Sequence, residues 1–301
     1  MRRGFPTFAY LVLLATLLLW SGNWIVARAV RDEISPGLAT AGRLLIVLFI
    51  LMPFCIGSLR RELPKLHKQH WKILFALGFF GGGLHLALQW LGLHYTTATS
   101  GILYLSTSPL FILLLARPLL GEPIGTRQWS GVAISFFGVL LIATQGRIQT
   151  LSFNIGDLMA LASMVMWSGY TVFLRLRRDP LETPEFLVVI CAIGLLFVSP
   201  WVLWEFLNEF ETHLSPLGAL AVLYSAVASL LVAYAGWSYA VTHLGAARAG
   251  VTLHLMPGLG VLLSMLFLGE YPRWFHGAGI ALILAGVALS SSRGNRPRVS
   301  P

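Results

Sequence analysis

The sequence has little charge. Of its 301 residues only 11% are charged and 56% are hydrophobic, whereas soluble domains average about 25% charged residues. The uncharged stretches form apolar runs of about 20 residues, the length at which a helix crosses about 30 Å of hydrocarbon. We therefore expect an integral membrane protein, and the net charge of +9 must be located along the chain before it is interpreted.

Cysteine is scarce as well, and familiar catalytic motifs are missing. Cys55 and Cys191 both lie within apolar runs, which indicates buried packing and no disulfide framework. The sequence contains no phosphate-binding loop, no metal-ligand constellation and no carboxylate pair suited to hydrolysis. We expect no cofactor, no metal and no use of ATP, and we expect that the protein is not an enzyme.

Carboxylates are missing from the apolar runs. All 12 acidic residues lie in expected loops or at expected helix ends, so no carboxylate is available near the membrane midplane for a proton relay or a sodium site. This pattern favours facilitated diffusion or exchange over strict ion coupling. His85 and His254 are the only central groups that titrate near neutral pH, and they leave weak proton coupling open.

The chain contains one pattern twice. The stretch that begins at Gln89 returns at Trp237, 148 residues later, so that Pro109 matches Pro257. Upstream, the triplet Trp-Ser-Gly occurs at 20–22 and again at 167–169. Self-similarity at a fixed period indicates a repeated structural unit. We therefore predict a tandem duplication, with one unit at 1–148 and the second at 149–301.

The apolar runs predict an all-α polytopic membrane protein with ten transmembrane helices, five in each unit. The expected spans are 8–29, 36–57, 72–93, 98–119, 128–146, 155–175, 185–204, 215–239, 246–268 and 274–292. Because five is odd, the second unit enters the membrane from the opposite side, which gives two inverted five-helix repeats. Inverted repeats are typical of secondary transporters, whose substrate site lies near the midplane between the halves.

The basic residues give the orientation. Of the 21, 16 fall in segments on the side of the N-terminus, and Arg43 lies within the second expected span. By the positive-inside rule both termini are cytoplasmic, in the cell (inner) membrane. Topology and contact with the lipid bilayer explain the positive charge, and we expect no nucleic-acid partner.

Three stretches resemble EamA-type transporters of the drug/metabolite transporter superfamily. They read LLLWSGNWIVAR, SPGLATAGRLLIVLFIL and GLHYTTATSGILYLSTSPLFILLLARPLLGE, the last being part of the repeated pattern. The resemblance implies ten helices, cytoplasmic termini, and export of amino acids or other small metabolites. It also implies a cavity lined by the first, third and fourth helices of each repeat. The second repeat departs from the first by lacking an arginine that matches Arg43.

Polar side chains within the spans predict the substrate site, because in lipid such groups turn toward the bundle interior or a wet cavity. The expected substrate-binding residues are Trp20, Asn23, Trp24, His85, Gln89, Tyr104, Ser108, Trp167, Tyr170, Tyr234, Trp237 and His254. They predict an aromatic, hydrogen-bonding cavity without fixed charge, suited to a zwitterionic or neutral small molecule. Pro109 and Pro257 each remove a backbone hydrogen bond, and we expect them to kink gating helices.

Simpler interpretations stay open for many of these residues. Trp20, Trp167 and Trp237 could belong to interfacial aromatic belts, and Arg43 could snorkel to the surface. The glycine pairs of the fifth and tenth spans predict close helix contacts: they are Gly131 with Gly138 and Gly279 with Gly286.

Function has alternatives too. A nucleotide-sugar or sugar-phosphate transporter would want intramembrane Lys or Arg, for which Arg43 alone is thin support. A membrane enzyme or scaffold using His85, His254 and Ser108 is the alternative from another class. A homodimer is left open.

Overall fold

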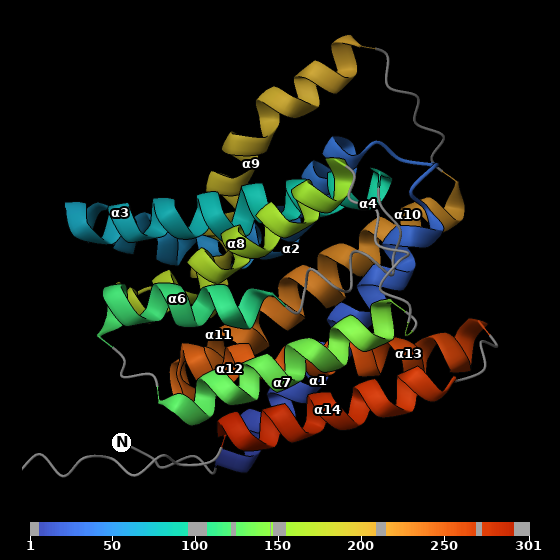
Figure 1. The fold of residues 1–301 in the computed structure, drawn as a ribbon. Coiled ribbons are helices and arrows are strands. Elements are labelled where there is room, and N and C mark those ends of the chain that lie inside the picture. The colour runs from blue at the N-terminus through green and yellow to red at the C-terminus, as the bar shows by residue number, and fades with distance from the viewer. Residues whose placement is uncertain are drawn as a thin grey trace, which may run out of the picture.

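Helices make up all the regular structure of the part of the chain that is described. The computed structural model describes residues 6–95, 107–121, 125–144, 146, 155–208, 215–268 and 273–291. Six of its helices or continuous helix series are long and apolar enough to cross a membrane. The protein is therefore an all-helical polytopic membrane protein, as its composition predicts (Figure 1).

The helices follow the expected spans closely. The names first unit and second unit are used below for residues 1–148 and 149–301 of the sequence. The first unit holds α1 (Pro6–Ala29), α2 (Pro36–Glu62), η1 (Leu63–Lys65), α3 (Lys68–Leu77), η2 (Gly78–Leu84), α4 (His85–Tyr95), α6 (Ser108–Leu120) and α7 (Thr126–Ala143). The second holds α8 (Ile155–Leu176), α9 (Thr183–Leu207), α10 (Pro216–Tyr224), η4 (Ser225–Val232), α11 (Ala233–Leu244), α12 (Ala246–Thr252), α13 (Leu255–Leu268) and α14 (Trp274–Ser291). The first nine residues of the fourth expected span, 98–106, lie outside the described residues.

Sequence signals explain where two of the long helices begin. Ser35 precedes α2 and its hydroxyl accepts a hydrogen bond from the Leu38 amide at 3.4 Å. Ser215 does the same for the Gly218 amide at the start of α10, at 3.0 Å. In both cases a proline follows the serine, at the first helical position, where the missing N–H costs no intrahelical bond.

A π-helical segment interrupts the third long helix of each unit. The segments are η2 (Gly78–Leu84) and η4 (Ser225–Val232), and a shift of 148 residues places η2 on 226–232, within η4. Each offers a backbone carbonyl to an aromatic side chain of the other unit. The Tyr234 hydroxyl donates to the Gly81 carbonyl at 2.9 Å, and the Trp20 indole donates to the Ser229 carbonyl at 2.9 Å. Gly81 and Ser229 are themselves 148 residues apart, so the two units meet through equivalent backbone positions.

Helix contacts between the two units recur in matching pairs. Helix α2 packs on α9, and η2 packs on α9 as η4 packs on α2. Similarly α4 packs on α8 as α11 packs on α1. Small residues permit the closest approach, because a Cβ added at Gly82 would meet the Ile190 carbonyl, and one at Gly194 would meet the Gly82 carbonyl.

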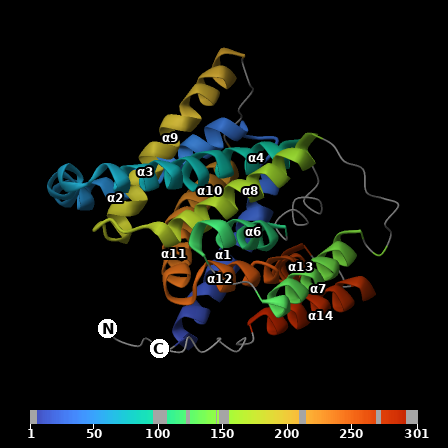
Figure 2. The same cartoon turned by 60° about the vertical axis from the view of Figure 1, so that its left-hand side comes forward.

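Helices α7 and α14 lie side by side along one edge of the bundle, at the bottom of Figure 1 and again in Figure 2. A Cβ added at Gly131 would lie 2.5 Å from the Gly286 carbonyl oxygen, and one at Gly138 would lie 2.6 Å from the Gly279 carbonyl oxygen. The close contacts that the heptad-spaced glycines predict are confirmed.

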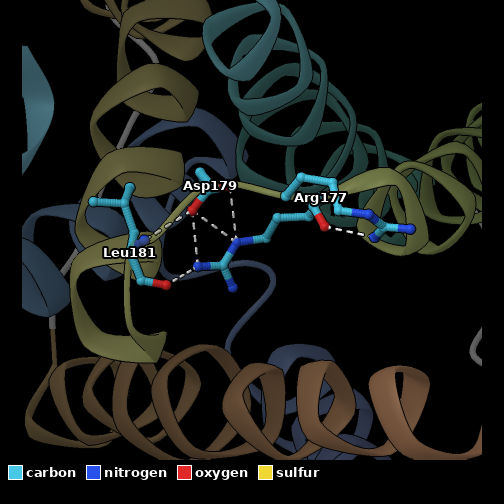
Figure 3. A network of polar contacts seen from close by, with 4 residues as sticks. Arg177, Asp179 and Leu181 are labelled. Atoms are coloured by element: carbon cyan, nitrogen blue, oxygen red, sulfur yellow. Dashed lines mark hydrogen bonds and ion pairs between the residues drawn. The ribbon is translucent and has the colours of Figure 1, made fainter. Parts of the chain in front are cut away.

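Polar contacts fix the connection between α8 and α9. Arg177 donates to both carboxylate oxygens of Asp179, at 3.0 to 3.1 Å, and to the Leu181 carbonyl (Figure 3). Its guanidinium also lies 4.1 Å from the centre of the Phe186 ring. The carboxylate side chain is almost fully buried, so this short connection holds the two helices at a defined angle.

Further contacts tie α2 to the second unit at the opposite end of α9. Glu205 of α9 is buried, and its Oε1 accepts a hydrogen bond from the Gly37 amide at 2.9 Å. The carboxylate thus lies at the N-terminus of α2, where the helix dipole favours a negative charge. Just before α10 the Ser215 hydroxyl donates to Glu33 at 2.5 Å.

Candidate substrate-binding cavity

A cavity lies in the interior of the bundle, between helices of both units. Its walls come from α1, α4 and α13, from α8, η4 and α11, and from the connection between α12 and α13. The lining residues are Trp20, Asn23, Trp24, His85, Leu86, Gln89, Trp167, Ser229, Tyr234, Leu253 and Met256. The space between them that no atom fills is about 380 Å³, counting the part open to the outside.

Seven of the twelve residues expected at the site line this cavity. They are Trp20, Asn23, Trp24, His85, Gln89, Trp167 and Tyr234. Tyr170 and Trp237 lie behind the wall, where their rings pack against those of lining residues. Tyr104 lies outside the described residues.

Aromatic rings from both units meet at one side of the cavity. The Trp20 and Trp167 rings, which occupy equivalent places in α1 and α8, are 4.9 Å apart and nearly perpendicular. Trp237 lies 5.4 Å from each of them, and Tyr234 is 5.5 Å from Trp167. All three tryptophans are at most 8% exposed, which contradicts the interpretation that they form a lipid-facing belt.

His85 is held by the second unit. Its Nδ1 lies 3.0 Å from the Ser163 carbonyl and 2.9 Å from the Ser163 hydroxyl, which itself donates to the His85 carbonyl. Both Nδ1 contacts therefore need a proton on Nδ1, and this tautomer is assigned from the hydrogen bonds. In the neutral ring Nε2 is then an acceptor. His85 consequently joins two helices and also gives the cavity wall a hydrogen-bonding group.

A serine of the second unit orients Asn23, as Ser163 orients His85. Its Oδ1 accepts a hydrogen bond from the Ser225 hydroxyl at 2.6 Å, so the π-helical segment η4 fixes the side chain. Gln89 lies one turn beyond His85 on α4 and completes the polar part of the wall. These contacts preorganise a site with hydrogen-bonding groups and aromatic surface.

The fourth helix of the second unit is broken beside the cavity. Helix α12 ends at Thr252 and α13 begins at Leu255, so Leu253 and His254 form the break. Pro257 lies in the first turn of α13, and Pro109 lies in the first turn of α6. Each proline therefore lies at the start of a helical segment, where its ring replaces an N–H that needs no partner, and the expected gating role of both stays a prediction.

Two expected site residues are buried away from the cavity lining. His254 is fully buried, and neither ring nitrogen has a hydrogen-bond partner among the described residues. Ser108 is also fully buried, and its carbonyl accepts a hydrogen bond from the Ser168 hydroxyl at 3.1 Å. Ser108 thus joins α6 to α8.

Arg43 also differs from expectation. It is 1% exposed, its Nη2 donates to the Leu86 carbonyl at 3.0 Å, and its guanidinium lies 5.5 Å from the centre of the Trp90 ring. The side chain therefore points into the bundle and does not snorkel to the surface.

Four of the residues that line the cavity are not predicted from the sequence. Leu86, Leu253 and Met256 are apolar residues in apolar runs and carry no signal of their own. Ser229 contributes the carbonyl that binds Trp20. The repeat could have indicated it, because Ser229 corresponds to Gly81 in the first unit.

Comparison with known proteins identifies the family. The model of the EamA-like transporter family matches the chain twice, at residues 7–144 and 154–292. An uncharacterized transporter of Archaeoglobus fulgidus is 29% identical over 292 residues, which cover 94% of this chain and 97% of the relative. The uncharacterized transporter YyaM of Bacillus subtilis is also 29% identical, over 94% of this chain and 93% of its own.

Two further likenesses are more distant. A protein of Streptantibioticus cattleyicolor named "probable terminal-alkyne amino-acid exporter" is 29% identical over 210 residues, 68% of each chain. A crystal structure of a protein with 22% sequence identity has the same fold, with a TM-score of 0.72 over 95% of this chain and 96% of that chain. The membrane-spanning helices and the transporter relatives together indicate a polytopic membrane transporter. The chain belongs to the EamA-like transporter family.

Proposed function

We propose that the protein is a secondary transporter that exports amino acids or similar small metabolites by alternating access. The observation that carries this proposal is the cavity, because equivalent elements of both units build it together. Trp20 and Trp167 flank it from α1 and α8. The π-helical segment η4 contributes Ser229 to the lining, and η2 binds the lining residue Tyr234 through the Gly81 carbonyl. A site shared by two similar halves can open to either side when the halves exchange conformations.

The proposed architecture is ten transmembrane helices in two inverted five-helix repeats. The paired packing of α4 on α8 and of α11 on α1 supports it. The glycine contacts between α7 and α14 also support it. Gly131 lies against Gly286 and Gly138 against Gly279, so the two equivalent helices run antiparallel. Further support comes from the two family matches, each of which spans about half of the chain.

The chemistry of the cavity supports the proposed class of cargo. Indole and phenol rings offer apolar surface, and Asn23, His85 and Gln89 offer hydrogen bonds. This combination suits a small, partly apolar molecule with polar groups at one end, as an amino acid has. The name of the Streptantibioticus cattleyicolor relative points to the same class of cargo. A phosphate-bearing cargo would need more cations than Arg43 supplies.

Counterflow into proteoliposomes tests this function. Purified protein is reconstituted into vesicles loaded with one unlabelled amino acid or metabolite, and uptake of the same labelled compound is measured. We expect uptake for at least one member of the panel after proton and sodium gradients are collapsed, because none of the described residues that line the cavity is acidic. Absence of counterflow across the whole panel would contradict the proposal, and loss of flux only under an uncoupler would indicate proton coupling.

We propose that the protein lies in the inner membrane with both termini in the cytoplasm. The distribution of basic residues along the sequence supports this orientation. Reporter fusions at Pro301 and in the 208–213 connection should report opposite sides of the membrane. Both reporters on one side would refute the ten-helix topology.

A further inference from the structure

Arg43 is a cation enclosed in the membrane-spanning part of the protein. It lies eight residues into α2, about 10 Å from the start of the helix, and it is 1% exposed. Its guanidinium donates a hydrogen bond to a neutral acceptor, the Leu86 carbonyl. Its Nε is buried without a partner among the described residues.

No carboxylate compensates this charge in the part of the chain that the structure describes. The ion pairs found there join residues of helix ends and connections, and none includes Arg43. Enclosing a cation without a counter-charge is costly, and the 5.5 Å contact with the Trp90 ring offsets only part of that cost. The site is therefore electrostatically prepared for an anionic group.

The guanidinium lies directly behind the cavity wall. Leu86, whose carbonyl it binds, lines the cavity, and so does Gln89, the residue before Trp90. The charge is also within electrostatic reach of His85 and Tyr234, two more lining residues. A small anion in the cavity would thus be attracted by the charge of Arg43, whereas a neutral water molecule in the same place would not neutralise that charge.

The charge is also asymmetric between the units. A shift of 148 residues places Arg43 on Cys191 of α9, which is buried and lies within electrostatic reach of the guanidinium. Both positions are buried, in helices α2 and α9 that pack on each other, and only one of them carries a charge.

We propose that Arg43 is a specificity-determining residue that selects cargo with a carboxylate or a similar anionic group. The inference rests on the proposed function and narrows it, since neutral metabolites are disfavoured. In this arrangement the aromatic rings of Trp20 and Trp167 receive the apolar part of the cargo. The anionic end points toward α4 and the guanidinium behind it.

Arg43 could instead serve only to bind the Leu86 carbonyl, and two substitutions separate the roles. Arg43→Lys keeps the charge and loses the planar guanidinium. Arg43→Gln keeps a donor for the carbonyl and loses the charge. A structural role is restored by whichever side chain reaches the carbonyl, whereas selection of anions follows the charge.

The test measures the charge preference of the cavity and does not need a known cargo. In a background of Cys55→Ser and Cys191→Ser, Gln89→Cys places one thiol in the cavity wall. Its reaction rates with anionic sulfonatoethyl methanethiosulfonate and cationic trimethylammonioethyl methanethiosulfonate are compared. The ratio of the two rates cancels differences in access.

The ratio is the rate with the anionic reagent divided by the rate with the cationic reagent. We expect a high ratio for the parent and for Arg43→Lys. Arg43→Gln should lower the ratio about tenfold or more, because it removes one nearby charge in a medium of low polarity. Lys68→Gln is the matched control, since it removes one exposed positive charge at the start of α3 and should leave the ratio unchanged. Arg43→Met replaces Arg43→Gln if the latter does not yield monodisperse protein.

An unchanged ratio in the charge-removing variant, or a thiol that neither reagent reaches, would overturn the proposal. Counterflow with an unchanged ratio would leave the transporter standing and refute only the role of Arg43. A lowered ratio in Arg43→Gln without counterflow would support the charge preference set by Arg43 and contradict the transport function.

Discussion

The contact between α7 and α14 allows a quantitative prediction. Gly138→Ala would place a methyl group 2.6 Å from the Gly279 carbonyl oxygen and 2.8 Å from the Leu282 Cβ. Ordinary van der Waals contact begins near 3.4 Å, so the helices would have to separate by about 0.8 Å. Backbone atoms form the obstacle, and side-chain rotation therefore gives no relief.

Overpacking of this kind costs about 1–3 kcal/mol. At about 2–4 °C per kcal/mol for a chain of this size, we expect the apparent unfolding temperature in detergent to fall by several degrees. Gly277→Ala is the matched control, because a methyl group there meets nothing within 4 Å. It should leave the temperature unchanged or raise it slightly, as alanine favours helix by up to about 1 kcal/mol. Equal temperatures for the two variants would refute the close contact.

Two more predictions concern the cavity and the junction of α2 with α9. In a cysteine-free background, a cysteine at Trp20 or Trp167 should be protected by cargo from a membrane-permeant thiol reagent, and alanine at either position should weaken cargo binding by about 1–3 kcal/mol; protection at neither position would contradict a shared site. Glu205→Gln removes the charge at the N-terminus of α2 and should lower stability by about 0.5–2 kcal/mol, seen as a lower unfolding temperature, whereas Glu182→Gln, at an exposed N-cap position without a side-chain hydrogen bond, should have a smaller effect. If both glutamate variants lose equal stability, the buried charge of Glu205 at the N-terminus of α2 contributes no more than an exposed one.

The helical membrane fold and much of the cavity are predictable from the sequence for one reason. Apolar runs report burial in lipid, and polar or aromatic residues within them report the bundle interior. Trp20 and Trp167 can be paired from the sequence because the repeat places them at equivalent points of two helices. His85 and Gln89 can be assigned to one wall because residues four apart share a helix face.

Other features depend on tertiary contacts that a local pattern does not encode. A π-helical turn has nearly the same side-chain pattern as an α-helix, so η2 and η4 gave no signal. The break at Leu253 and His254 likewise lies inside a single expected span, 246–268. The side chain of Arg43 is long enough to reach either the surface or the interior, and only the position of the Leu86 carbonyl and the Trp90 ring decides between them.

The two π-helical segments also bear on the history of the chain. A π turn arises when one residue is inserted into an α-helix, and it persists where it serves a functional site. Because η2 and η4 occupy equivalent positions in the two family matches, a single insertion before the predicted duplication would explain both. The ancestral half-length protein would then have carried the bulge already and, as a pair of identical chains, would have formed the same crossing that the modern chain makes within itself.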